Sequence, residues 1–126
     1  AAARIAAGEG GGLAIDARGA ERFAGEEAVA VDPGRGHIPG ARNVPWAANV
    51  DPATKRMRSR DELAGIYARV GVDADRTVMC SCGSGVSACI DLLALEHIGV
   101  RDTRLFVASW SGWSADPERP RATGAA

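Results

Sequence analysis

The sequence contains no long hydrophobic run and no excess of charge of one sign. No apolar stretch approaches the roughly 20 residues that a helix needs to cross a bilayer. The Ala- and Gly-rich start also lacks the continuous apolar segment of a secretion signal. The 15 Lys and Arg residues are interspersed with 16 Asp and Glu residues, so the net charge is −1. We therefore expect neither a membrane partner nor a nucleic-acid partner.

Cysteine and histidine are both scarce. The three cysteines, Cys80, Cys82 and Cys89, are an odd number and lie close together, which is not the spacing of a disulfide framework. We therefore expect a cytoplasmic, reducing compartment. A zinc site typically needs four ligands in paired motifs. Because one residue separates Cys80 from Cys82 and the only histidines are His37 and His97, we expect no metal.

The composition is that of one ordinary globular domain. The chain has 126 residues, of which 46% are apolar and 25% charged. Residues 1–12 are rich in Ala and Gly and are predicted to be a linker or a disordered N-terminus, which leaves residues 13–126 as a single domain. Short apolar runs predict strands at Leu13–Asp16, around Asn43–Val44, at Thr77–Cys80 and at Arg104–Ala108.

Helical patterns lie between these runs. Residues 20–25 can form one or two turns, and Ser59 with Glu62 has the spacing of a capping box in front of a well-marked helix that Gly71 can close. The stretch from Val86 to Ile98 is apolar on nearly every face, so we expect it to be covered on more than one side. Strands that alternate with helices predict an α/β fold with a mainly parallel sheet.

Cys82 stands at the junction between the strand at 77–80 and the helix that follows. Ligands of α/β sheets bind at the carboxyl ends of strands. The unpartnered N–H groups and the dipole at a helix start stabilise a thiolate there. Gly83 and Gly85 let the main chain curl around the sulfur, and Ser84 and Ser87 add hydroxyl donors. We therefore predict that Cys82 is a nucleophile.

The other two cysteines are interpreted differently. Cys80 lies inside the strand and Cys89 is expected to face inward from the helix, so both are predicted to be small core residues. A cysteine phosphatase also carries its cysteine at a helix start, but it needs an arginine six positions later. Position 88 is alanine, which argues against phosphate chemistry.

The chain resembles the rhodanese family, specifically the C-terminal catalytic domain of thiosulfate/3-mercaptopyruvate sulfurtransferases. The resemblance is carried by "IDAR" with "ERFAGE", "GHIPGARNVPW", "CGSGVSAC", and "SWSGWSADPERP" with "ATG", in this order along nearly the whole chain. It implies a five-stranded, mainly parallel sheet flanked by helices on both faces. It also implies an enzyme that uses no metal and no organic cofactor.

The resemblance further implies a reaction. Cys82 would take sulfane sulfur from 3-mercaptopyruvate or thiosulfate as a persulfide and pass it to a thiol or cyanide acceptor. The substrate-binding residues would be Arg22, which reaches the substrate anion, and the persulfide cradle of Gly83, Ser84, Gly85, Val86 and Ser87. Since this loop carries no charge, we expect 3-mercaptopyruvate to be the better donor. The alternative is a non-catalytic rhodanese-like binding or regulatory module; such modules commonly lose the cysteine.

Other residues of these blocks receive structural interpretations. Asp16 and Arg18 are expected to form structural ion pairs, and His37 to be a satisfied structural histidine. Arg35 is the nearest candidate for a second substrate arginine.

The last block departs from the family at two positions. Ala108 stands where members usually have Gly, and Gly112 where they usually have Glu. Trp110 and Trp113 are expected to flank a turn, to pack in the core and to wall the entrance to the site. In the family that the chain resembles, this order of blocks belongs to the second of two similar domains. We therefore expect an N-terminal rhodanese domain, or self-association, to cover apolar surface near these tryptophans.

Overall fold

The structure, a computed structural model, describes residues 2–6, 8, 11–25, 35–73, 75–82 and 87–124. Within these residues the sheet has four strands in the order β2-β1-β3-β4, and every pairing is parallel. The strands are β1 (Leu13–Asp16), β2 (Arg42–Asn43), β3 (Thr77–Ser81) and β4 (Asp102–Leu105). The parallel sheet is confirmed, but the expected five strands are corrected to four for this part of the chain. The other described residues form helices, turns and two isolated bridges, His37 with Ala122 and Val50 with Met57.

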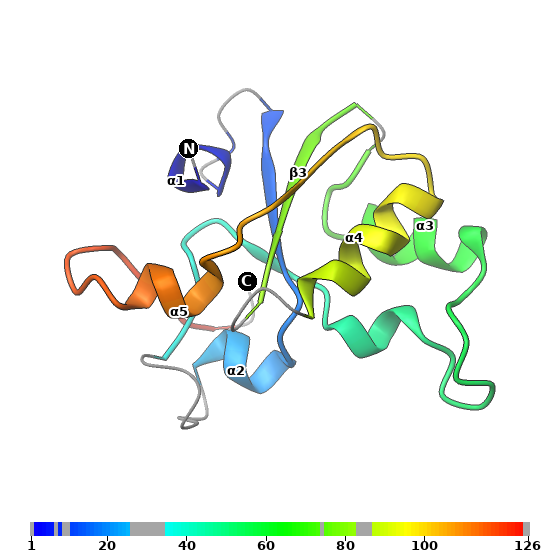
Figure 1. Ribbon diagram of the computed structural model, residues 1–126, viewed down its shortest axis with the longest axis horizontal. Helices are drawn as coiled ribbons and strands as arrows, with labels where there is room; N and C mark the ends of the chain where they lie inside the picture. The colour runs from blue at the N-terminus through cyan, green and yellow to red at the C-terminus, as the bar shows by residue number, and fades with distance from the viewer. Residues whose placement is uncertain are drawn as a thin grey trace.

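Helices cover both faces of the sheet, as expected (Figure 1). On one face lie α3 (Arg60–Ala68) and α4 (Ala88–His97). On the other lie α1 (Ala2–Ala6), α2 (Ala20–Ala24) and α5 (Ser109–Ser114). A short 3-10 helix, η2 (Trp46–Asn49), follows β2. None of the helices described is long and apolar enough to span a membrane.

The two faces of the sheet bury different side chains because successive strand residues point to opposite sides. Ile15 and Cys80 belong to the apolar cluster under α3 and α4. Their neighbours Ala14 and Met79 belong to the cluster under α1, α2 and α5. Burial on both faces explains why these strands read as continuous apolar runs in the sequence.

Several local predictions are confirmed. Strand β1 has the predicted bounds, and β3 extends one residue past the predicted Cys80. At the start of α3, the Ser59 hydroxyl accepts a hydrogen bond from the Glu62 N–H at 3.3 Å and donates to Glu62 Oε1 at 3.1 Å. Gly71, at φ +96°, takes the left-handed conformation expected just beyond a helix. These features depend on residues close together in the sequence.

Two expectations about chain ends and strands are wrong. Residues 2–6 are not linker but helix α1, because Ile5 and Ala6 give it an apolar side that packs under the sheet. The strand expected at residues 104–108 runs instead from Asp102 to Leu105. The chain turns at Val107, whose side chain is 70% exposed, so that α5 can begin at Ser109.

Helix α4 also differs from its prediction. It begins at Ala88, so Ala88, Asp91 and Leu95 face the core at helical spacing. Cys89 is exposed rather than inward-facing, and Leu93 is 57% exposed. The helix is therefore covered on one side, and Cys89 is not a core residue.

Candidate functional site

Cys82 follows β3 directly, at the carboxyl edge of the sheet. Strand β3 lies between β1 and β4, and the register places its last residue, Ser81, opposite Asp16. Cys82 is buried and belongs to the apolar cluster that includes Ala88, the first residue of α4. The predicted strand–cysteine–helix order is therefore present. Gly83, Ser84, Gly85 and Val86 lie outside the described residues.

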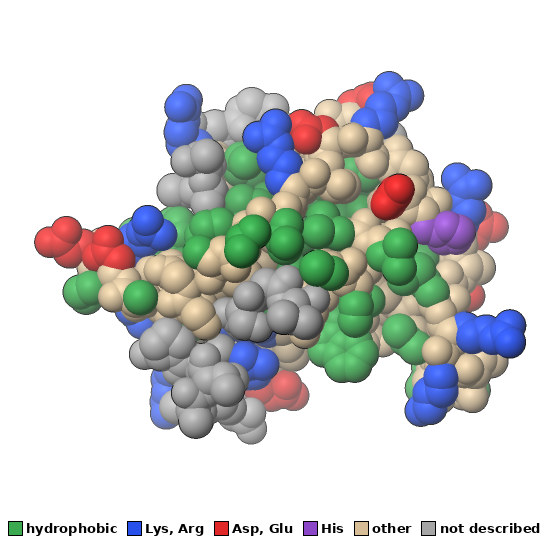
Figure 2. Space-filling model, viewed as in Figure 1, with side chains coloured by type: hydrophobic (Ala, Val, Ile, Leu, Met, Phe, Trp, Pro, Cys, Tyr) green, Lys and Arg blue, Asp and Glu red, His purple; other side chains and the backbone are tan. Residues whose placement is uncertain are grey.

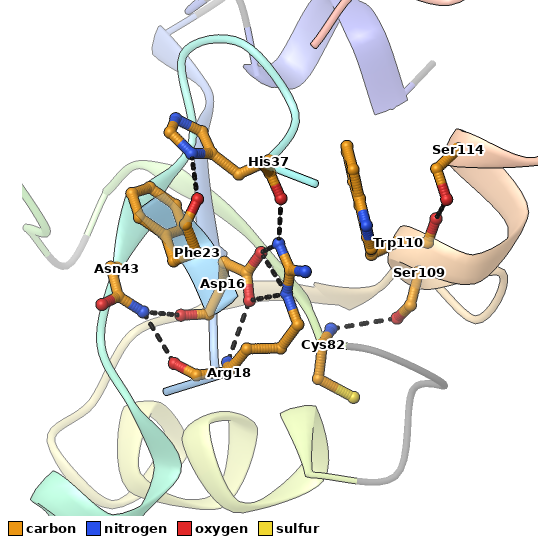
Figure 3. Close-up of polar contacts among 10 residues, drawn as sticks. Asp16, Arg18, Phe23, His37, Asn43, Cys82, Ser109, Trp110 and Ser114 are labelled. Atoms are coloured by element: carbon orange, nitrogen blue, oxygen red, sulfur yellow. Dashed lines mark hydrogen bonds and ion pairs between the residues drawn. The ribbon is translucent and has the colours of Figure 1, made fainter. Parts of the chain in front are cut away.

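Both peptide groups of Cys82 are held by the start of α5, and Figure 3 shows the contact with Ser109. Its N–H donates to Ser109 Oγ at 3.1 Å, and its carbonyl accepts from the Trp110 N–H at 2.9 Å. The Ser109 hydroxyl in turn donates a hydrogen bond to the Phe106 carbonyl at 2.8 Å. The segment after β4 therefore fixes the backbone from which the Cys82 thiol projects.

Ser109 was missed by the sequence analysis. It is fully buried and has φ +52°, a left-handed conformation that costs a non-glycine residue free energy. The three hydrogen bonds of Ser109 and Trp110 offset that cost. No signal in the sequence could have found it, because its partner Cys82 is 27 residues away.

Asp16 and Arg18 form a buried ion pair with each other beside this site, as predicted. Arg18 Nη2 lies 2.9 Å from Asp16 Oδ2, Arg18 Nε lies 3.1 Å from both carboxylate oxygens, and Nη2 also donates to the Gly36 carbonyl at 2.7 Å. The guanidinium lies 5.0 Å from the centre of the Trp110 ring, within cation–π range. Gly36 is at φ +97°, and a Cβ there would collide with the Ala122 carbonyl, so only glycine fits.

His37 has the structural role that was predicted. Its ring stacks on Phe23 with centroids 3.6 Å apart, and Nδ1 donates to the Phe23 carbonyl at 2.7 Å. Its backbone exchanges two hydrogen bonds of 2.9 Å with Ala122. Burial lowers the pKa of His37, although the Phe23 carbonyl opposes that shift. The ring is therefore held as a neutral donor.

For three residues predicted to contact the substrate, the structure gives the position and the burial of the side chain. Arg22 is half-buried on α2, which begins at the same carboxyl edge of the sheet as Cys82 (Figure 1). Arg35 is exposed, one residue before the Gly36 carbonyl that Arg18 binds. Ser87 is half-buried at the N-cap of α4, and its side chain makes no capping hydrogen bond. Their contacts with a substrate remain predictions.

The two tryptophans of the last sequence block and Cys80 are all buried. Trp110 and Trp113 are buried core residues, as expected, but they lie on α5 rather than beside a turn. Cys80 is fully buried, and burial first, then the negative charge of Asp91, raises the pKa of its thiol. Cys80 is therefore a protonated core residue. Within the described ranges, no group of three or more His, Cys, Asp or Glu side chains could hold a metal ion.

Comparisons with known proteins agree with this arrangement. A family model described as Rhodanese-like domain matches residues 2–116. The chain is 44% identical to the 3-mercaptopyruvate sulfurtransferase of Escherichia coli (strain K12) over 111 residues, which cover 84% of this chain and 37% of that protein. It is 43% identical to the putative thiosulfate sulfurtransferase SseB of Mycobacterium tuberculosis (strain ATCC 25618 / H37Rv) over 120 residues, which cover 95% of this chain and 41% of that protein.

A solved structure is similar as well. The Tum1 protein from Saccharomyces cerevisiae superposes with a TM-score of 0.78 at 31% identity, over 97% of this chain and 42% of that chain. The chain thus spans about two fifths of the length of these relatives.

Proposed function

This chain belongs to the rhodanese-like family, and on that premise we propose that it is the catalytic domain of a sulfurtransferase that carries sulfane sulfur as a persulfide on Cys82. The observation that supports this most directly is the position of Cys82. It lies at the carboxyl end of β3 and precedes α4 in the chain, with both its peptide groups hydrogen-bonded to α5. A fixed thiolate at such an edge can act as a nucleophile without a metal.

The reaction is a double displacement. The Cys82 thiolate attacks the thiol sulfur of 3-mercaptopyruvate, or the outer sulfur of thiosulfate, and an S–S bond forms. The C–S bond of 3-mercaptopyruvate breaks and its electron pair leaves as the enolate of pyruvate, which takes up the proton of the thiol; from thiosulfate the S–S bond breaks and sulfite leaves with the pair. An acceptor thiolate or cyanide then attacks the outer persulfide sulfur and releases the Cys82 thiolate. Each step transfers one sulfur atom and needs no external oxidant or reductant.

The donor that we propose is 3-mercaptopyruvate. Thiosulfate is a small dianion that would gain from a cation next to the attacked sulfur. Residues 83–87 carry no charge in the sequence. The carboxylate of 3-mercaptopyruvate lies farther from its sulfur, and Arg22 on α2 is the residue that we assign to bind it. Cys80 lies in the core and takes no part in the proposed reaction.

We further propose that another domain covers part of the active face. Three large apolar side chains are exposed in the described structure: Val107 by 70%, Leu93 by 57% and Trp46 by 44%. Figure 2 shows hydrophobic side chains gathered on the face that carries β4 and α4. The interface expected near Trp110 and Trp113 is therefore assigned to Val107 on the preceding loop, since both tryptophans are buried. An N-terminal domain of the same family is the partner that this surface fits.

One experiment tests the proposed function. The protein is incubated with 3-mercaptopyruvate, its intact mass is measured, and it is then treated with cyanide. We expect one added sulfur that maps to Cys82 and an equal amount of thiocyanate. An unmodified mass, with no thiocyanate from either 3-mercaptopyruvate or thiosulfate, would favour the alternative of a non-catalytic module.

A further inference from the structure

A buried polar cluster lies under α4, and neither the fold nor the proposed chemistry explains it. Asp91 is fully buried on α4, and its Oδ1 accepts a hydrogen bond from Asn49 Nδ2 at 2.7 Å. Asn49 Oδ1 in turn accepts from the Tyr67 hydroxyl at 2.7 Å. Asn49 and Tyr67 are fully buried too. We name these three residues the Asp91 cluster; it connects η2, α3 and α4.

The second carboxylate oxygen of Asp91 is the unusual member. Among the described residues, Oδ2 is buried and has no hydrogen-bond partner. Buried carboxylates are normally paired or fully hydrogen-bonded, because desolvation of the charged form is costly. Burial raises the pKa of Asp91 to about 7; the hydrogen bond from Asn49 and the nearby Tyr67 hydroxyl oppose the rise, and the charge of Asp16 adds to it. Asp91 therefore exchanges a proton near neutral pH.

Other ionisable groups lie on the elements around Asp91. Burial raises the pKa of Tyr67 on α3 and of Cys80 on β3, so both stay protonated. Asp16 on β1 is ion-paired with Arg18. Cys89, the neighbouring thiol on α4 itself, is exposed. Cys82 lies in the same apolar cluster as Cys80 and is the proposed nucleophile, so the comparison with Asp91→Asn is needed to separate a change of charge at Asp91 from one at Cys82.

The Asp91 cluster is connected in two ways to the carboxyl edge of the sheet, where Cys82 lies. Along α4, Asp91 is three residues after Ala88, where the helix that follows the Cys82 loop begins. Through η2, Asn49 Nδ2 also donates to the Trp46 carbonyl at 3.0 Å, and the Trp46 N–H donates to Ala17 at 2.9 Å. The Ala17 N–H then donates to the Ser81 carbonyl, the residue before Cys82, at 2.7 Å.

We propose that Asp91 is a positioning residue that, in its neutral form, keeps the start of α4 packed beside Cys82, so that sulfur transfer weakens when this buried carboxyl ionises. The proposal rests on the proposed function of Cys82. A protonated carboxyl is neutral and costs far less to bury than the ionised form, whose charge must be desolvated. Ionisation leaves a buried negative charge with one satisfied oxygen, and the Tyr67 hydroxyl can turn from Asn49 to the carboxylate only by giving up its bond to Asn49.

The test compares the full chain with Asp91→Asn, which keeps the size and the Oδ1 acceptor but carries no charge. Amide and carboxyl NMR signals are followed from about pH 5.5 to 8.5 without any sulfur donor. We expect the Asp91 carboxyl and the amides of residues 88–90 to titrate together with a midpoint near 7, and the amide titration to vanish in Asp91→Asn. Asp102→Asn is the matched control; Asp102 is half-buried on β4, and hydrogen bonds from Arg104 and Thr77 lower its pKa, so its replacement should leave the midpoint unchanged.

Activity supplies the second readout. The ratio of the cyanolysis rate of the wild type to that of Asp91→Asn is expected to fall as the pH rises through the Asp91 midpoint. A ratio that stays constant, or helix-start amides that do not follow the Asp91 carboxyl, would overturn the proposal. If Asp91→Asn does not fold, Tyr67→Phe replaces it and should raise the Asp91 midpoint. If no variant transfers sulfur, the proposed function fails, whereas the NMR titration and the alkylation rate of Cys82 still decide the role of Asp91.

Discussion

Ala108 and Gly112 cannot both carry a side chain in this fold. A Cβ built at Gly112 would collide with the Cβ of Ala108, which precedes α5, while the Gly112 N–H donates to the Ala108 carbonyl at 2.8 Å. These are the two positions at which the last sequence block departs from the family it resembles. The structure explains them as one compensated change: the methyl group gained at 108 occupies the space that a side chain at 112 would need.

We predict that Gly112→Ala destabilises the protein by about 1–3 kcal/mol, the usual cost of overpacking. Adding Ala108→Gly should recover most of that loss, because it removes the atom with which the new Cβ collides. The measurement is the free energy of unfolding in urea for both single variants and the double variant. Gly65→Ala is the control: Gly65 is also inside a helix, has no neighbour within 4 Å of a Cβ, and should gain about 0.5–1 kcal/mol. Equal losses in the single and double variants would contradict the compensation.

The three cysteines should separate by function. Cys82→Ser is expected to abolish sulfur transfer and leave the far-UV and near-UV circular dichroism unchanged, because a hydroxyl is similar in size but cannot form a persulfide. Cys89→Ser should keep full activity and stability, since the side chain is exposed. Cys80→Ser should keep activity but lose roughly 1–3 kcal/mol of stability from the buried hydroxyl. Sulfur transfer that persists in Cys82→Ser would contradict the assignment of the nucleophile.

Donor preference tests the uncharged loop and Arg22 together. We expect a higher kcat/KM for 3-mercaptopyruvate than for thiosulfate, and an Arg22→Ala variant whose KM for 3-mercaptopyruvate rises about tenfold or more, as the loss of a charged hydrogen bond implies. Arg35→Ala, at an exposed position on the neighbouring segment, tests the other candidate arginine. If Arg35→Ala raises KM and Arg22→Ala does not, the carboxylate is bound by Arg35. Faster turnover of thiosulfate would contradict the donor assignment.

Because His37 is buried, we predict that its protonation lowers the free energy of unfolding in acid. Its folded-state pKa lies below the ordinary 6.5, so the unfolded chain binds the extra proton first. The stabilisation is therefore complete above about pH 6.5 and is lost as the pH falls through the lower folded pKa. His37→Gln should be less stable at every pH but should lose less between about pH 7.5 and 5 than the wild type does. Asp91 contributes a pH dependence of the opposite sign to both proteins, so its effect cancels when the two free energies of unfolding are subtracted. His97→Gln, at an exposed position, is the control and should follow the wild-type dependence on pH.

Exposed apolar side chains predict an effect of a covering domain. A version of the protein that also carries an N-terminal domain of the same family should turn over faster than the 126-residue chain, because a covered site positions its substrate better. Val107→Ser should reduce that gain, and it should reduce self-association if the single chain dimerises. Sedimentation and kcat/KM measure the two effects. A monomeric single chain with turnover equal to the longer version would contradict this expectation.

The sequence by itself determined the elements whose signals are local. Strands β1 and β3, the capped start of α3 and the strand–cysteine–helix junction at Cys82 all depend on residues a few positions apart. Alternation, capping and helical periodicity act over such distances. Structural ion pairs were expected for Asp16 and Arg18, and the structure shows that they pair with each other, two residues apart.

Tertiary structure decided everything that depends on distant segments meeting. Ser109 reaches Cys82 across 27 residues and Asn49 reaches Asp91 across 42, so neither contact has a local pattern. Cys89 looked like a core residue because its helix is apolar on nearly every side. Which side of that helix is buried depends on its first residue, Ala88, and on the sheet beneath it. Likewise Ala108 and Gly112 are related only because the left-handed Ser109 turns the chain between them.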